Sequence, residues 1–406
     1  MTRKTYLWIL LGGFLVAGVG LWMELGVGQK VEMVASAEGC DVIAGSSTQV
    51  ENAAEKARRM AIARLGPLKH KQGTNGADLY KQAMGLYAGL SEDEKDMLKH
   101  WRDRPDPKAA EALHLKIQPI MELLRRARKA DYVDWGMGPM SFDDMSDRSG
   151  QYRAVQALAA LASWEATCRF GSDPSGALAD LAAMEAMGRS EADSAVGLMV
   201  EDGIHFLGMN VMAYSASSIT NADDPNLAYV LDPAAVARAF QTGLRGEATM
   251  VQAGLGAYAD LATRKQTTIQ KWVTSGTVTP QEVVSQMQWL SQTEQALAYT
   301  LKEPDGQFQQ WWNRKLAEAA SMPLASSALS AMGDIRTLAV ASMAESAMLE
   351  AGLALEQGDQ QGFLAIGDPA SGKPFAYKET ADGFQLSSVL QRKGRPVSLS
   401  FSLAGK

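Results

Sequence analysis

The sequence contains only two cysteines, Cys40 and Cys168, among its 406 residues. Two cysteines cannot build a metal site by themselves, and a disulfide between them stays an open alternative because no sequence feature supports it. Aromatic residues make up only 7% of the chain, whereas alanine and methionine are plentiful. This balance favours helices over sheets. Positive charge is also scarce: the formal net charge of −7 argues against a nucleic-acid partner, which would need a concentrated positive stripe.

Familiar catalytic motifs are missing as well. The chain has no Gly-x-Ser-x-Gly elbow, no His-Glu-x-x-His pair and no recognisable Ser-His-Asp order. Of the four histidines, only His205 has carboxylates at both i−4 and i−3, namely Glu201 and Asp202. A metal site would need a further ligand and a general base would need a cleft, so these three residues are weak candidates. We therefore predict no catalytic residue, no metal and no cofactor, and expect an ordinary polar helix face here.

The most distinctive feature that is present is an uncharged run from Tyr6 to Met23. As a helix this run would rise about 27 Å, close to the roughly 30 Å hydrocarbon core of a bilayer. Arg3 and Lys4 precede the run, so the positive-inside rule places the N-terminus in the cytoplasm and exports the rest. Residues 1–24 are thus predicted to be a cytoplasmic tip and a single-pass signal anchor. Residues 6–23 are expected to cross the inner membrane.

A cleaved signal peptide is the alternative interpretation of the same segment. Ala35-Ser36-Ala37 matches a small-residue cleavage site, although it lies well beyond the hydrophobic run. Cleavage near Ala37 would leave a secreted or periplasmic protein. Without cleavage, residues 25–47 form a linker between the anchor and the exported part.

Helical signals continue from the linker to Gly358. We predict a basic helical region over 48–130, an irregular acidic and aromatic loop over 131–150, and further helices over 151–358. A small antiparallel β module is predicted over 359–406, where alternating apolar residues are separated by turn signals. The fold class is therefore mainly α: an irregular helical-hairpin bundle or solenoid-like array with an N-terminal transmembrane helix and a small β module.

Charge is distributed unevenly along this helical part. From Thr48 to Lys129 there are 17 Lys and Arg residues against 11 Asp and Glu, whereas Asp131 to Asp232 holds 4 against 16. One interpretation is a solvated surface that happens to be lopsided. The other is that the two regions attract each other or a charged partner.

The centre of the predicted fold is the stretch from Tyr152 to Tyr214, here called the hub. Its three apolar-periodic runs predict three antiparallel helices packed side by side, and Asp173-Pro174 provides a cap and a first-turn proline for the second. Leu181 is expected to be buried between the first and third helices, with Glu185 nearer the rim. The predicted inward faces are Val155, Leu158, Ala159 and Ala162, then Leu178, Leu181 and Ala182, then Val196, Val200, Gly203, Leu207, Val211 and Tyr214.

Two stretches resemble known families. The first reads Leu161-Ala162-x-x-Glu165-Ala166, Gly171-x-Asp173-Pro174-x-x-Ala177-Leu178 and Met187-Gly188-Arg189. It resembles one tetratricopeptide-type hairpin, a helical repeat of about thirty residues. The second reads Asp368-Pro369-Ala370-Ser371-Gly372-Lys373-Pro374-Phe375-x-Tyr377 and Asp382-Gly383-Phe384-x-Leu386-x-Ser388-Val389. It resembles the C-terminal strand module of pseudopilin-like proteins and of uncharacterised, membrane-anchored helical proteins of the bacterial envelope. This second resemblance implies an envelope location and no particular activity.

The acidic and aromatic loop is the candidate partner-binding site, since loops carry much of the recognition in scaffold proteins. We expect the chain to be a membrane-anchored, exported scaffold that binds a protein partner. Two alternatives stay open: an envelope hydrolase or metal-binding enzyme that uses Glu201 and His205, and a structural component of a secretion or pilus-like assembly. The candidate partner-binding residues are Asp131, Asp134, Trp135, Phe142, Asp143 and Asp144.

Overall fold

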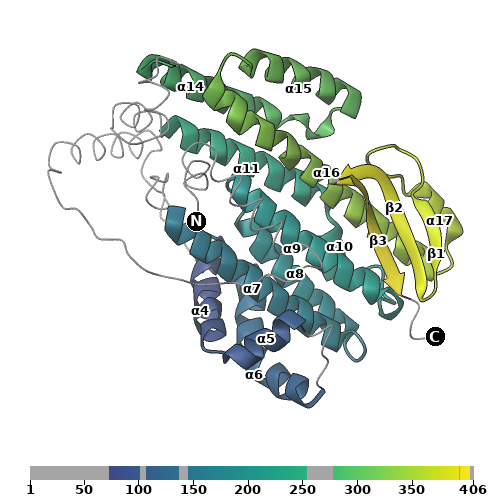
Figure 1. Cartoon of the computed structure of the whole chain (residues 1–406). Coiled ribbons are helices and arrows are strands. Elements are labelled where there is room, and N and C mark those ends of the chain that lie inside the picture. The colour runs from purple at the N-terminus through teal and green to yellow at the C-terminus, as the bar shows by residue number, and fades with distance from the viewer. Residues whose placement is uncertain (1–72, 101–106, 137–144, 254–277, 393, 403–406) are drawn as a thin grey trace, which may run out of the picture.

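A computed structural model describes residues 73–100, 107–136, 145–253, 278–392 and 394–402. Within these ranges the chain is mainly helical and ends in a small antiparallel sheet, which confirms the mainly α part of the prediction and the C-terminal β module (Figure 1). The predicted span 6–23, the cleavage site near Ala37 and the linker 25–47 lie outside the described residues.

Three helices form the first part of the structure: α4 (Gly76–Ala88), α5 (Glu92–His100) and α6 (Pro107–Arg128). The side chain of Asn75 accepts a hydrogen bond from Ala77 N and caps α4. Ser91 and Glu94 form a reciprocal capping box at the start of α5, because each side chain bonds the other's backbone N–H. Local capping chemistry therefore explains where these two helices begin.

The hub consists of α7 (Met145–Arg169), α8 (Pro174–Ser190) and α9 (Ala195–Tyr214), which contact one another pairwise. The predicted three-helix arrangement is confirmed. Asp173 accepts a hydrogen bond from Gly176 N at 2.9 Å and caps α8 as expected. Because α7 begins at Met145, the end of the segment predicted to be irregular is helical.

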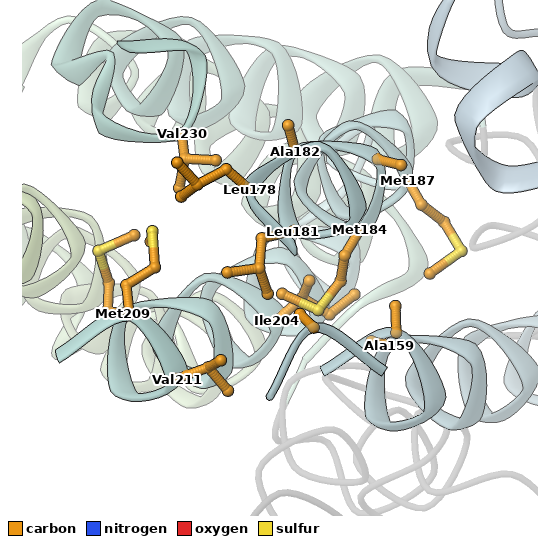
Figure 2. Packing of buried hydrophobic residues seen from close by; sticks show 14 of the residues in the cluster. Ala159, Leu178, Leu181, Ala182, Met184, Met187, Ile204, Met209, Val211 and Val230 are labelled. Carbon is orange, nitrogen blue, oxygen red and sulfur yellow. The ribbon is translucent and has the colours of Figure 1, made fainter. Parts of the chain in front are cut away.

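Leu181 is fully buried at the centre of the hub. Figure 2 shows Leu181 and Met184 of α8 extending toward Ile204 of α9. The predicted inward faces of the first two helices are correct, since all their members are buried. The predicted face of α9 is wrong at Tyr214, which is 61% exposed although its neighbours Met212 and Ala213 are fully buried, so its side chain lies on the solvent side of the helix. Gly203 and Leu207 of the same predicted face are half-buried.

Charged contacts join the first helices to the hub. Arg125 Nε of α6 donates to Asp180 Oδ1 of α8 at 2.6 Å, and Arg169 Nη1 of α7 donates to Asp180 Oδ2 at 2.8 Å. Asp180 is fully buried. Asp180 of the acidic region thus pairs with Arg125 of the basic region. At this contact the two regions attract each other, as one of the two interpretations of the uneven charge expects.

After the hub, a second apolar core forms between α11 (Pro233–Ala253), α14 (Pro280–Leu297), α15 (Asp305–Ala319) and the long helix α16 (Pro323–Glu356). A capping box between Thr279 and Glu282 starts α14. The remaining short elements are the 3-10 turns η2 (Ala216–Ser218) and η3 (Thr300–Lys302) and the helices α10 (Pro225–Leu231) and α17 (Gln360–Ala365).

Helix α16 belongs to both cores. Its N-terminal half, including Leu324 and Ile335, packs into the second core, and its C-terminal half, including Met348 and Leu349, packs against the hub. Of the described helices, only the Met332–Glu356 part of α16 is long and apolar enough to cross a membrane. That part is 67% buried inside the protein and packs as a core helix.

The sheet has the order β1-β2-β3, with β1 (Ala376–Thr380), β2 (Gly383–Arg392) and β3 (Arg395–Ser402) all antiparallel. It packs on α16 and on α9, at the end of the molecule where α16 stops (Figure 1). The approach is close: a Cβ atom placed on Gly352 of α16 would lie 2.1 Å from the ring of Phe401. The absence of a side chain at Gly352 therefore leaves room for the ring of Phe401 against α16.

Candidate functional site

The three weak candidates of the sequence, Glu201, Asp202 and His205, all lie on α9 and are all buried. The expectation of an ordinary polar helix face is wrong at these positions. The C-terminal half of α16, the end of α8 and strand β2 surround them. They belong to a polar set that is buried except for its two partly exposed arginines, here called the charge cluster: Glu185, Arg189, Glu201, Asp202, His205, Ser342, Glu345, Ser346 and Arg392.

His205 is the centre of the cluster and is completely buried. Its Nδ1 lies 3.0 Å from Glu185 Oε1, and its Nε2 lies 3.1 Å from both the carbonyl oxygen of Ser342 and Oγ of Ser346. Ser346 Oγ also donates to the Ser342 carbonyl at 3.1 Å, a bond back along its own helix. Both ring nitrogens of His205 therefore have partners, on α8 and on α16.

The charges around His205 favour the imidazolium form. Burial by itself would lower the pKa of His205, but the negative charges of Glu185, Glu201 and Glu345 outweigh it and raise that pKa to about 9. A protonated ring donates from both nitrogens, which fits Glu185 on one side and the Ser342 carbonyl on the other. Near neutral pH, His205 thus acts as a buried cation that joins α8 to α16.

Asp202 connects the same cluster to the C-terminal sheet. Its Oδ1 accepts from Ser342 Oγ at 2.9 Å, and its Oδ2 accepts from Arg392 Nη2 at 2.8 Å. Burial raises the pKa of Asp202, and the nearby charge of Arg392 opposes that rise. One carboxylate therefore ties three elements together: α9, α16 and β2.

Two further carboxyl groups of the cluster carry an oxygen with no hydrogen-bond partner among the described residues, Glu201 Oε1 and Glu345 Oε2. Burial raises the pKa of Glu201 to about 7. Burial, with the negative charge of Asp202, raises the pKa of Glu345 to about 8. Glu201 also lines a small pocket between α9, α11 and α16, whose other walls include Asp202 and Ser342. These two carboxyl groups are thus largely neutral in the buried state at mildly acidic pH.

The chain of contacts from Glu185 through His205 to Ser346 has the connectivity of a catalytic triad. Its chemistry differs from that of a triad in three respects. The imidazolium has no lone pair with which to accept the serine proton, all three side chains are buried, and Ser346 lies within the C-terminal half of α16 and not at a turn or helix end. In the described part of the chain, no group of three or more His, Cys, Asp or Glu side chains has the arrangement of a metal site.

Sequence reasoning missed most of this cluster. Glu185, predicted at the rim of the hub, is fully buried, so that prediction is wrong. Ser342, Glu345 and Ser346 have the i, i+3, i+4 spacing of one helix face within an otherwise apolar run, and this signal could have been found. Nothing in the local sequence singles out Arg392.

The predicted partner-binding loop is described only in part. Asp131 and Asp134 are exposed, whereas Trp135 is 8% exposed and stacks on Tyr80 at a centroid distance of 5.6 Å. The side chain of Asn75 donates to the Asp134 carbonyl at 2.8 Å and holds the loop against the start of α4. The remaining candidates Phe142, Asp143 and Asp144 lie outside the described residues.

Comparisons of the chain with protein-family models, with curated proteins and with solved structures find no match. The resemblances to a tetratricopeptide hairpin and to envelope strand modules therefore stay predictions from the sequence.

Proposed function

We propose that this protein is a membrane-anchored, exported helical scaffold that binds a protein partner. The observation that carries the proposal is the internal bonding of the charge cluster: His205, Asp202 and Arg392 contact residues of their own chain and join α8, α9, α16 and β2. Histidine, aspartate and arginine side chains, which are common catalytic residues, here join helices and a sheet of the same chain. Such a framework suits the presentation of surfaces to a partner.

The anchor is the run from Tyr6 to Met23, with Arg3 and Lys4 on its cytoplasmic side. The exported part is an irregular helical-hairpin bundle in which α7 and α8 form the tetratricopeptide-like hairpin.

A reporter fusion tests this topology. A reporter enzyme that works only outside the cytoplasm should be active when it is fused after Lys406. A fusion that works only with a cytoplasmic reporter would reject this topology. N-terminal sequencing that starts at Glu38 would replace the anchor with a cleaved signal peptide.

The partner-binding surface is the loop around the exposed residues Asp131 and Asp134. A photo-crosslinking amino acid at position 134 should yield one adduct of defined mass in intact cells, and the same probe at the exposed position Glu318 on α15 should not. Equal adducts from both positions, or none from either, would remove this loop as the binding surface. An adduct with subunits of a secretion or pilus-like assembly would favour that alternative instead.

A serine hydrolase is the second candidate, and the contacts from Glu185 through His205 to Ser346 are what favour it. A fluorophosphonate probe reacts with activated serines and decides between the two functions. The scaffold proposal expects no labelling of Ser346 at pH 7 or at pH 9.5, where His205 is less protonated. Labelling that disappears in Ser346→Ala and persists in the neighbouring Ser342→Ala would establish the hydrolase.

A further inference from the structure

Strand β1 forms an open edge of the C-terminal sheet (Figure 1). It pairs only with β2, and every residue of Ala376–Thr380 is exposed. Among the described elements, β2 alone makes an extended contact with β1, and no described residue forms a backbone hydrogen bond with the outer side of β1. The other edge strand, β3, instead packs on α9 and α16. The outer side of β1 therefore carries backbone N–H and C=O groups that have no partner in the described part of the chain.

The pairing along this edge is regular. It runs without interruption from Ala376 opposite Ser387 to Thr380 opposite Gly383. The register shift of the sheet lies between β2 and β3, on the side of β2 that faces away from the open edge. A bulge in an edge strand is one of the devices that prevent a further strand from pairing. Strand β1 lacks that device and keeps the regular shape that another strand needs.

The chemistry of the edge specifies what binds there. Donors and acceptors that alternate along a strand are complemented by the backbone of another extended polypeptide. An apolar contact is available beside them, because Tyr377 is 50% exposed and stacks on Phe384 of β2 at a centroid distance of 5.6 Å. An aromatic or β-branched residue opposite Tyr377 would pack on this pair of rings. The edge thus fits an extended peptide segment as long as β1.

The charges of β1 disfavour a second copy of this chain as the occupant. Lys378 and Glu379 are both exposed. The symmetric antiparallel register that uses all of β1 places the two copies of Lys378 directly opposite each other, and a shifted register that centres on Glu379 does the same with two carboxylates. Like charges directly opposite each other on neighbouring strands are destabilising. The edge therefore selects a different protein, with an acidic residue opposite Lys378 and a basic residue opposite Glu379.

We propose that the open edge of β1 binds an extended segment of a partner protein, which adds a further antiparallel strand to the sheet. From its N-terminus, this segment places a basic residue opposite Glu379, an acidic residue opposite Lys378 and an aromatic or β-branched residue opposite Tyr377. Antiparallel pairing continues the arrangement of the existing strands and is the more stable orientation per residue. The inference rests on the proposed scaffold function and gives it a second binding surface, in addition to the loop at Asp131 and Asp134.

Two labelled peptides of the same composition test the proposal on the full-length protein in detergent. The matched peptide contains Thr-Lys-Glu-Val-Thr, and the swapped peptide contains Thr-Glu-Lys-Val-Thr, which places like charges opposite Glu379 and Lys378. Fluorescence anisotropy should show that the matched peptide binds about fivefold more tightly or better, because two favourable charge pairs replace two unfavourable ones. In the double variant Lys378→Glu with Glu379→Lys, the preference should reverse. Both positions are exposed, so the substitutions should leave the fold unchanged.

Methylation of the peptide backbone distinguishes strand addition from attraction between charges alone. In an antiparallel pair, alternate residues direct their N–H groups toward the neighbouring strand. N-methyl groups on one alternating set of residues in the matched peptide should therefore abolish binding, and N-methyl groups on the other set should leave most of it. Equal effects of the two sets would show that the peptide does not pair with β1 through its backbone.

Three further results would overturn the proposal: binding of neither peptide, equal binding of both, or a preference that the charge reversal leaves unchanged. The test is separate from those of the scaffold function. A crosslinked adduct at position 134 together with no peptide binding would remove only the strand addition, and the scaffold proposal would stand.

Discussion

Arg392 Nη2 lies 2.8 Å from Asp202 Oδ2, although the two residues are 190 positions apart in the chain. The contact places a residue from the predicted β module inside the polar interior of the helical hub. The sheet is therefore attached to the helices by charge as well as by apolar packing.

Removal of Arg392 should destabilise the protein more than removal of an exposed arginine on the neighbouring strand. Arg392→Ala leaves Asp202 buried without its cation, and breaking such a pair costs up to about 3–5 kcal/mol. Arg395→Ala is the control, because Arg395 is exposed, and its cost should stay within about 0.5 kcal/mol. Denaturant unfolding of both variants measures the difference. Equal costs would mean that the pair contributes nothing to stability.

Leu181 should be among the most sensitive apolar positions of the hub. Its side chain is fully buried between helices, so Leu181→Ala removes burial and leaves a cavity, at a cost of about 2–5 kcal/mol. Leu115→Ala on α6 makes the same chemical change at a side chain that is 69% exposed, and should cost much less. Thermal melting of the two variants provides the comparison. Similar shifts in Tm would contradict the packing of α8 at the centre of the hub.

Glu185→Ala should be severely destabilising, in contrast to what a rim position would predict. The substitution removes the carboxylate that faces His205 Nδ1 and leaves a buried imidazolium unpaired, at a cost of about 3–5 kcal/mol at pH 6. Glu122→Ala, at an exposed position of α6, should change the free energy of unfolding by about 0.5 kcal/mol or less. A small effect at position 185 would show that His205 is neutral in the folded protein.

Stability of the whole protein should fall as pH rises from about 6.5 to about 9. The pKa of His205 is raised from 6.5 to about 9 in the folded state, so its contribution is complete below pH 6.5 and is lost as pH rises through 9. Burial raises the pKa of Glu201 to about 7 and of Glu345 to about 8, and their effect has the same sign, because the folded state holds protons that the unfolded chain has released. Urea unfolding across this range should show a smaller decline for His205→Gln. A rise in stability with pH would contradict the assignment.

A second buried carboxyl group offers an independent test outside the charge cluster. Glu294 on α14 is fully buried, neither of its oxygens has a hydrogen-bond partner among the described residues, and burial raises its pKa well above the usual range. Glu294→Met should therefore stabilise the protein at pH 8 by about 1–4 kcal/mol. The gain should shrink at pH 5, where the free carboxyl group is partly protonated in the unfolded chain too. A loss of stability at pH 8 would mean that Glu294 has a partner after all.

Several features of the fold follow from the sequence because their causes are local. Asp173 caps α8 and Thr279 caps α14, and each does so by bonding a backbone N–H three residues ahead. The apolar stripe through Leu181 and the mainly helical composition are similar signals. These caps and stripes depend on residues within one or two turns of the same helix, so the local sequence is sufficient to predict them.

The charge cluster depends on contacts that are not local, and only the tertiary structure decided it. His205 meets the carbonyl of Ser342 across 137 positions, and Asp202 meets Arg392 across 190. The sequence by itself identified Glu201, Asp202 and His205 as neighbours on one helix surface. Whether that surface faces water or another helix is fixed by the path of the chain, and here α16 and the sheet cover it. Burial of the same residues changes them from an ordinary polar face into a network of ion pairs and hydrogen bonds, because charges that water no longer screens interact strongly.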